Sequence, residues 1–222
     1  MAAATSSPPR TRDVSSPDTS PTPPGLARSS HDTYLAPESP FPSAVEDAAT
    51  DYRWLMEEGH RPERIIIVGD SSAGGLSVAT ILKLREDGTP LPAGGVSISP
   101  VGGFGLHRPD ARDERRSGSH GDQGQPDAHG WPVPQRRGPA HPARPPLYAD
   151  HSGLPPLLKV VGGDEELLDD SVGLARAAGI AGVDVTLYIG AGMQHIFPIY
   201  CGVMPEADAV VAMIGAWMRA RT

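Results

Sequence analysis

The sequence has no asparagine, a single cysteine and only two lysines among its 222 residues. One cysteine, Cys201, excludes a disulfide framework and fits a reducing compartment, so we expect a cytoplasmic protein. No apolar run approaches the roughly 20 residues that a membrane-spanning helix needs. The first residues also lack the apolar core of a secretory signal. These absences predict a protein without disulfides and without a transmembrane segment.

Charge and composition limit the partners further. The net charge of −8, with a pI near 5.4, gives no general attraction to nucleic acid or to anionic membranes. Residues 1–33 and 101–146 are poor in apolar periodicity, so we predict a disordered N-terminal segment and a low-complexity insert within a domain spanning 34–222. The histidines of the insert have no compact ligand spacing, so we expect no metal site there: His107, His120, His129 and His141.

The stretch from Arg64 to Leu76, RIIIVGDSSAGGL, predicts a strand, a tight turn with two serines, and the start of a helix. Four β-branched residues in a row favour a strand covered on both faces. The apolar spacing of LSVATILKLRED favours a helix that ends at Gly88. A serine in this context is typical of a nucleophile elbow. A turn that only joins the strand to the helix, or one that binds phosphate, is the alternative interpretation.

Two adjacent serines compete for the role of nucleophile in this turn. Ser71 has a small residue two positions away on either side, Gly69 and Ala73. For Ser72, the residue two positions before it is Asp70, whose side chain would crowd the turn. We therefore predict Ser71, although alanine stands where the G-x-S-x-G pattern has its second glycine.

Further elements follow the same alternation. Strands are predicted at 95–99, 156–163 and 183–189, and helices at 44–59, at 167–178 and from Pro205 onward. Helices between buried strands predict an α/β fold with a parallel sheet and right-handed crossovers. In such a sheet, side chains just past the carboxyl ends of the strands meet at the ligand-binding edge.

Three chemically complementary side chains follow strand ends in the order serine, acid, histidine: Ser71, Asp164 and His195. A serine hydroxyl becomes a strong nucleophile only when an imidazole accepts its proton. The imidazole in turn needs a carboxylate that fixes its tautomer and stabilises its charged form. The order of the three residues along the chain is that of α/β-hydrolases.

Four segments carry a family resemblance: YLAPESPFPSAVEDA, RIIIVGDSSAGGLSVAT, LYADHSGLPPLLKVVGGDEELLDDSV and GMQHIF. They resemble the motifs of the hormone-sensitive-lipase-like group of α/β-hydrolases, the bacterial esterases often labelled fold-3. The resemblance covers roughly 34–100 and 147–222, and its motifs occur in the family's order.

The resemblance implies an α/β-hydrolase fold with a partial parallel sheet flanked by helices. It implies a serine carboxylic-ester hydrolase acting on short or medium acyl esters or lactones, with no cofactor and no metal. Ser71 would be the nucleophile, His195 the base and Asp164 the acid that orients it. The partner would be a small-molecule ester, and the oligomeric state, a homodimer included, stays open.

One family motif is absent from this sequence. The family carries a His-Gly-Gly motif upstream of its nucleophile, whose amides form most of the oxyanion hole, and no such motif precedes Ser71. The Ser72 N–H is the recognisable remaining donor. We therefore expect an N-terminally incomplete chain, and we interpret residues 1–30 and 101–146 as translated from a shifted reading frame. The alternative functions are a non-catalytic truncated hydrolase remnant and a small-ligand-binding protein on the same scaffold.

Overall fold

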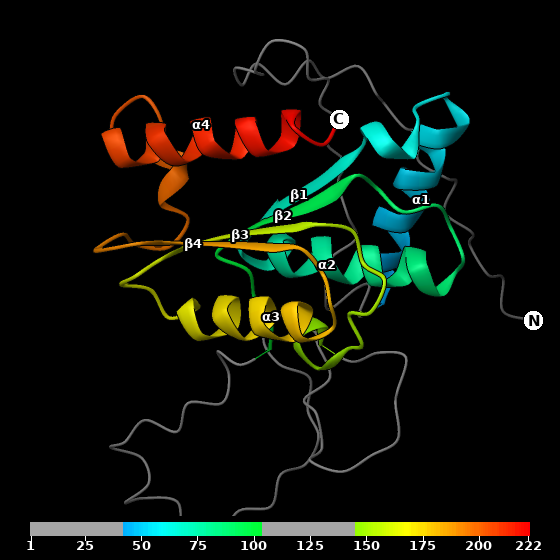
Figure 1. Cartoon of the computed structure of the whole chain (residues 1–222), viewed down its shortest axis with the longest axis horizontal. Coiled ribbons are helices and arrows are strands. Elements are labelled where there is room, and N and C mark those ends of the chain that lie inside the picture. The colour runs from blue at the N-terminus through cyan, green and yellow to red at the C-terminus, as the bar shows by residue number, and fades with distance from the viewer. Residues whose placement is uncertain (1–41, 104–144) are drawn as a thin grey trace, which may run out of the picture. The chain divides into compact units, whose positions relative to one another are not determined.

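The computed structural model describes residues 42–103 and 145–222, and in it helices separate β1 from β2 and β3 from β4, whereas the described residues between β2 and β3 hold only a 3-10 turn (Figure 1). The strands are β1 (Ile66–Asp70), β2 (Gly94–Ile98), β3 (Leu157–Gly162) and β4 (Val185–Gly190). The helices are α1 (Ser43–Glu57), α2 (Ser71–Glu86), α3 (Leu168–Ile180) and α4 (Pro205–Arg219), with short 3-10 turns at Pro62–Arg64, Pro146–Tyr148 and Phe197–Tyr200. The segment 1–33 and most of the 101–146 insert lie outside the described residues.

The described strands form one sheet in the order β1-β2-β3-β4, and every neighbouring pair is parallel. This confirms the predicted α/β class with a parallel sheet. The carboxyl ends of the strands therefore lie along one edge, because all four strands run in the same direction. The register places Ser97 of β2 beside Lys159 of β3.

Helices cover both faces of this sheet, with α2 and α3 on one side and α4 on the other (Figure 1). The α4 side has a core in which Val210 and Trp217 pack with Val160. On the opposite side, Ile81 and Leu157 belong to the core beneath α2. Every residue of β3 is buried, as expected for an inner parallel strand.

Strand β1 is less covered than its sequence predicts. Among the described residues it pairs with β2 alone, so it forms an edge of the sheet. The side chain of Val68 is 49% exposed, although a run of β-branched residues favours burial on both faces. The prediction of a fully covered strand is wrong for the described structure, because the sheet continues on only one side of β1.

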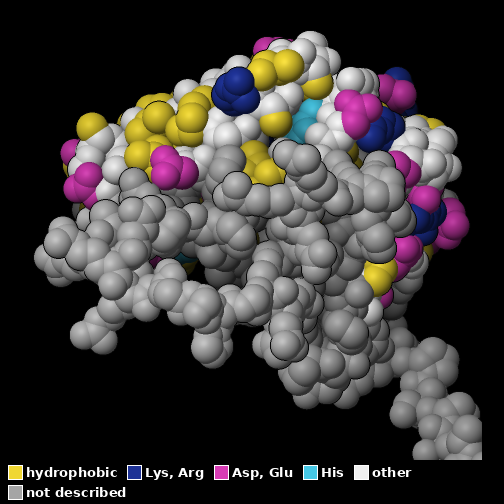
Figure 2. Space-filling model, turned by 90° about the horizontal axis from the view of Figure 1, so that it is seen from below, with side chains coloured by type: hydrophobic (Ala, Val, Ile, Leu, Met, Phe, Trp, Pro, Cys, Tyr) yellow, Lys and Arg dark blue, Asp and Glu magenta, His cyan; other side chains and the backbone are white. Residues whose placement is uncertain are grey.

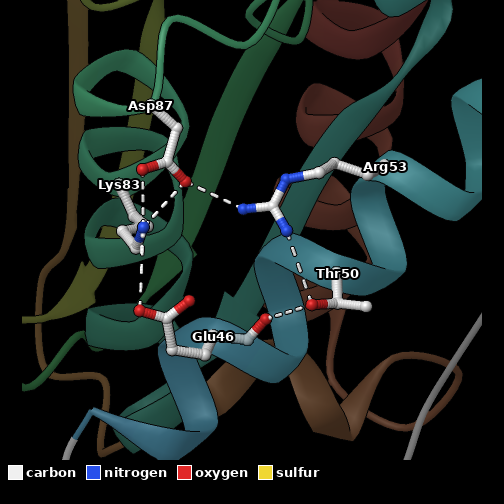
Figure 3. Close-up of polar contacts among 5 residues, drawn as sticks. All are labelled: Glu46, Thr50, Arg53, Lys83 and Asp87. Atoms are coloured by element: carbon white, nitrogen blue, oxygen red, sulfur yellow. Dashed lines mark hydrogen bonds and ion pairs between the residues drawn. The ribbon is translucent and has the colours of Figure 1, made fainter.

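A polar cluster on the surface joins α1 to α2 (Figure 3). Asp87 accepts hydrogen bonds from Lys83 at 2.6 Å and from Arg53 at 2.8 Å. Lys83 also lies 3.6 Å from a carboxylate oxygen of Glu46. The hydrogen bond from Lys83 lowers the pKa of Asp87. Since these charges are partly exposed, they contribute less to the attachment of α1 than Tyr52 and Leu84, which are buried beneath them.

Several large apolar side chains are exposed on the described surface. Val203, Ile180 and Ile199 are 84%, 71% and 68% exposed. Figure 2 shows hydrophobic side chains gathered on one part of the visible surface, with charged side chains between and beside them. Among the described helices, none has the length and hydropathy to cross a bilayer.

Among the buried charged residues of the core is a lysine, which cores rarely hold. Lys159 of β3 is 0% exposed. Burial lowers the pKa of its ammonium group from 10.5 to about 7. Below pH 7 the folded protein carries the full cost of the buried charge, because the lysine is then protonated in both states. That cost disappears as the pH rises from 7 toward 10.5 and the folded state releases its proton first.

We therefore expect the free energy of unfolding of the wild-type chain to rise by about 2 kcal/mol between pH 7 and pH 9 relative to Lys159→Met. Urea denaturation of both proteins at the two pH values measures this difference. Other titrating groups are common to both proteins and cancel in the comparison. Parallel stability profiles for the two proteins would contradict the prediction.

Candidate active site

The turn between β1 and α2 holds Ser71 in a strained conformation. Its φ is +51°, in the left-handed region that residues other than glycine seldom adopt. The N–H of Val101 donates a hydrogen bond to the Ser71 carbonyl at 3.0 Å, which fixes the turn from the strand-end segment after β2. Val101 is buried, although the sequence pattern assigns it to the low-complexity insert. A serine on a strained strand-to-helix turn is the geometry of a nucleophile elbow.

Close backbone contacts explain which small residues this turn needs. A Cβ at Gly69 would collide with the carbonyl oxygen of Ala73, and one at Gly75 with the carbonyl oxygen of Val101. A Cβ at Gly74 would lie 2.9 Å from the Cα of Pro100. The glycine requirement therefore falls at 69, 74 and 75, whereas Ala73 is exposed and its methyl group has room.

His195 reaches Ser71 from the loop after β4. Its Nε2 lies 3.1 Å from the Ser71 Oγ, and its Nδ1 lies 3.2 Å from the Glu165 Oε1. The histidine side chain is 41% exposed and the Glu165 side chain is 1% exposed. The structure thus brings two predicted residues, Ser71 and His195, into contact across 124 positions of sequence. One ring nitrogen faces a hydroxyl and the other a buried carboxylate, as an activated serine requires.

The acid beside His195 is not the predicted one. Asp164 was expected to orient the imidazole, but its side chain is exposed and the carboxylate in contact with His195 belongs to Glu165. The reason is the turn after β3. There the Asp164 N–H donates to the Met193 carbonyl at 3.0 Å, while residue 165 turns its side chain back toward the strand end. The structure therefore replaces Asp164 with Glu165 as the candidate acid.

Two donors hold the other oxygen of Glu165. The Ser99 Oγ donates to Oε2 at 2.7 Å, and the Gly162 N–H donates to the same atom at 2.7 Å. The Ser99 Oγ also accepts a hydrogen bond from the Ile196 N–H at 3.0 Å, next to His195. Ser99 thus fixes both the acid and the histidine loop. The sequence analysis did not identify Ser99 as a site residue. Its position directly after β2, at the edge where strand-end side chains meet, was the signal that could have identified it.

The predicted oxyanion donor, the Ser72 N–H, lies in the first turn of α2. Amides in a first helical turn have no partner within the helix, so they are free to receive a developing negative charge. The role of Ser72 stays a prediction. No cluster of residues suited to a metal occurs in the two described ranges, and the four histidines of the insert lie outside them.

The chain is similar to known proteins along most of its length. A family model described as the α/β-hydrolase fold matches residues 30–199. An acetyl-hydrolase of Streptomyces hygroscopicus is 39% identical over 198 residues, which cover 84% of this chain and 62% of that protein. An esterase from the bacterial hormone-sensitive lipase family is 39% identical with a TM-score of 0.70, covering 86% of this chain and 64% of the other.

A third similar protein is EstE5, whose crystal was soaked with p-nitrophenyl butyrate. It is 35% identical with a TM-score of 0.71, and the similarity covers 86% of this chain and 64% of the other. The chain thus spans less than two thirds of the length of each of these three proteins. The residues that the family model matches, 30–199, include the strained serine turn and the histidine loop. The chain therefore belongs to the α/β-hydrolase fold family, in its hormone-sensitive-lipase-like group.

Proposed function

We propose that this protein hydrolyses carboxylic esters with short or medium acyl chains, or lactones, and that Ser71 is the nucleophile. The observation that carries the proposal is the continuous contact from the Ser71 Oγ through His195 to the buried Glu165 carboxylate. The names of the similar proteins, an acetyl-hydrolase and esterases, support the same class of substrate.

The contacts support a two-step acyl transfer. The Ser71 Oγ attacks the ester carbonyl while its proton passes to Nε2 of His195. The tetrahedral intermediate then expels the alcohol, which takes that proton, and leaves an acyl group on Ser71. Water attacks the acyl group with His195 again accepting a proton, and the carboxylic acid leaves with Ser71 restored.

Glu165 acts in this scheme through the imidazole. We assign the Nδ1 proton of His195 to the hydrogen bond with Oε1, which leaves Nε2 free to accept the Ser71 proton. The buried carboxylate then stabilises the imidazolium that forms. The Ser72 N–H donates to the oxyanion, at the positive end of α2.

The competing function is a non-catalytic hydrolase scaffold, or one that binds a small ligand without turning it over. It is favoured by the absence of a His-Gly-Gly motif before Ser71, because losing one oxyanion donor costs about 10²–10³ in rate. A serine whose proton is accepted by a neighbouring histidine reacts with organophosphates, whereas an unactivated serine does not. Reactivity at Ser71 therefore separates the two functions.

We expect diethyl p-nitrophenyl phosphate to release one equivalent of p-nitrophenol per folded chain and to leave a diethylphosphoryl group on Ser71. Tandem mass spectrometry that fragments between positions 71 and 72 locates the adduct. Protein unfolded in urea is the control, because its serines have no partner histidine. Hydrolysis of p-nitrophenyl butyrate should stop in proportion to labelling. A folded chain that takes no label, or takes it on Ser72, contradicts the proposal.

A further inference from the structure

The buried lysine in β3 begins a chain of hydrogen bonds that ends in the serine turn. The Lys159 Nζ lies 3.0 Å from the Ser97 Oγ on β2. The Ser97 Oγ lies 3.0 Å from the Ser77 Oγ on α2, and the Ser77 Oγ donates to the Gly74 carbonyl at 2.8 Å. All three side chains are buried. The chain therefore crosses two strands and one helix without contact with solvent.

Proton counting fixes the direction of this chain. A serine hydroxyl has one proton, and that of Ser77 is used on the Gly74 carbonyl. The Ser77 oxygen must then accept the proton of Ser97, whose own oxygen is left to accept from Lys159. The first member must be a donor, and an amino group is a donor in both its charged and its neutral form. An apolar residue at position 159 would leave the chain without its terminal donor.

The far end of the chain of hydrogen bonds lies at a closely packed position of the turn. Gly74 is three residues after Ser71, and a Cβ there would lie 2.9 Å from the Pro100 Cα. A small displacement of the first turn of α2 would therefore move Ser71 relative to the strand ends. The same strand that carries Lys159 leads directly into Glu165, whose oxygen contacts His195. The chain of hydrogen bonds therefore links β3, the strand that leads to Glu165, to α2, the helix that begins at Ser71.

We propose that Lys159 is a positioning residue for Ser71, acting through Ser97 and Ser77 on the first turn of α2. The role in turnover rests on the proposed ester hydrolysis. Stability alone gives no reason for a lysine here, because burying an amine is costlier than burying a methylene side chain of similar volume. The free-energy cost of burying the charged amine is reflected in its pKa, which burial lowers to about 7.

Three variants separate positioning from general core packing. Lys159→Met keeps the length of the side chain and removes the donor, whereas Lys159→Gln keeps an N–H donor. Leu157→Ala is the matched control, because Leu157 is fully buried on the same strand and the same face, in the core under Ile81. All three are compared with wild type at pH 8. The rate of p-nitrophenyl butyrate hydrolysis is divided by the concentration of serine that reacts with the organophosphate, and this ratio at saturating substrate is kcat.

We expect Lys159→Met to lower kcat about tenfold with KM within twofold of wild type, since the misplacement affects the attacking oxygen rather than substrate binding. Lys159→Gln should retain kcat within about threefold, and Leu157→Ala should lose thermal stability while keeping kcat. Equal losses of kcat in Lys159→Met and Leu157→Ala would overturn the proposal, as would an unchanged kcat in Lys159→Met.

A second measurement needs no turnover. Amide hydrogen exchange of a peptide spanning 71–78 reports the opening of the first turn of α2. We expect it to be at least about fivefold faster in Lys159→Met than in wild type and unchanged in Leu157→Ala. If the wild-type chain neither hydrolyses esters nor reacts with the organophosphate, the proposed function fails, and the exchange rates still decide whether Lys159 positions the turn. Equal exchange in all proteins would overturn that role.

Discussion

Ser71→Ala should abolish ester hydrolysis, lowering kcat by at least about 10⁴-fold, to the level of the assay background. The Ser71 Oγ is the atom that His195 Nε2 faces at 3.1 Å, so its removal leaves the imidazole with no hydroxyl to activate. The fold should survive, because the turn is held by backbone contacts from Val101 and by the glycines around it. Alanine also adopts a positive φ no less readily than serine.

The assay compares wild type, Ser71→Ala and Ser152→Ala at equal concentrations of folded protein, measured by circular dichroism. Ser152 is exposed in the loop before β3 and serves as the matched control for removal of a hydroxyl. Ser152→Ala should keep full activity. Hydrolysis that persists in Ser71→Ala would assign the reaction to another group and remove the basis of the proposed mechanism.

The second large effect distinguishes the two acids after β3. We expect Glu165→Gln to lower kcat by about 10³–10⁴-fold and Asp164→Asn to change it by less than about threefold. In Glu165→Gln, the Ser99 hydroxyl and the Gly162 amide both donate, so they hold the amide oxygen on their side. The NH₂ group then faces Nδ1 of His195. Nδ1 must then accept a hydrogen bond from the NH₂ group, so the proton of the neutral ring lies on Nε2. A protonated Nε2 can no longer take the Ser71 proton.

A third variant tests this explanation. Glu165→Asp keeps a carboxylate but shortens the side chain, so its activity should fall between those of wild type and Glu165→Gln. The pair Glu165→Gln and Asp164→Asn makes the same chemical change at neighbouring positions and controls for general effects on the loop. A large loss in Asp164→Asn with little loss in Glu165→Gln would restore the assignment made from the sequence.

Local pattern was sufficient for most of the fold. The strand at 156–163 and the helix from Pro205 were predicted within one or two residues of β3 and α4, because buried β-branched runs and helical apolar spacing are local properties. The order of the strand-end residues also predicted the contact between Ser71 and His195. Exposure of β1 was not predictable from its own residues, since burial depends on what lies beside a strand.

The choice of acid lay beyond the sequence pattern. Positions 164, 165 and 166 are all acidic, and a turn directs each consecutive side chain differently. Which of them reaches His195 depends on the donors that surround it, Ser99 directly after β2 and the Gly162 amide at the end of β3. Those groups come from separate segments, so spacing along the chain carries no information about their convergence.

The sequence by itself therefore determined the α/β class, the serine turn and the family, because each rests on residues close together in the chain. The tertiary structure decided which acidic residue contacts His195, the contacts of Ser99 and the surroundings of Lys159. These depend on contacts between β2, β3 and α2, elements whose relative placement appears only when the sheet has formed.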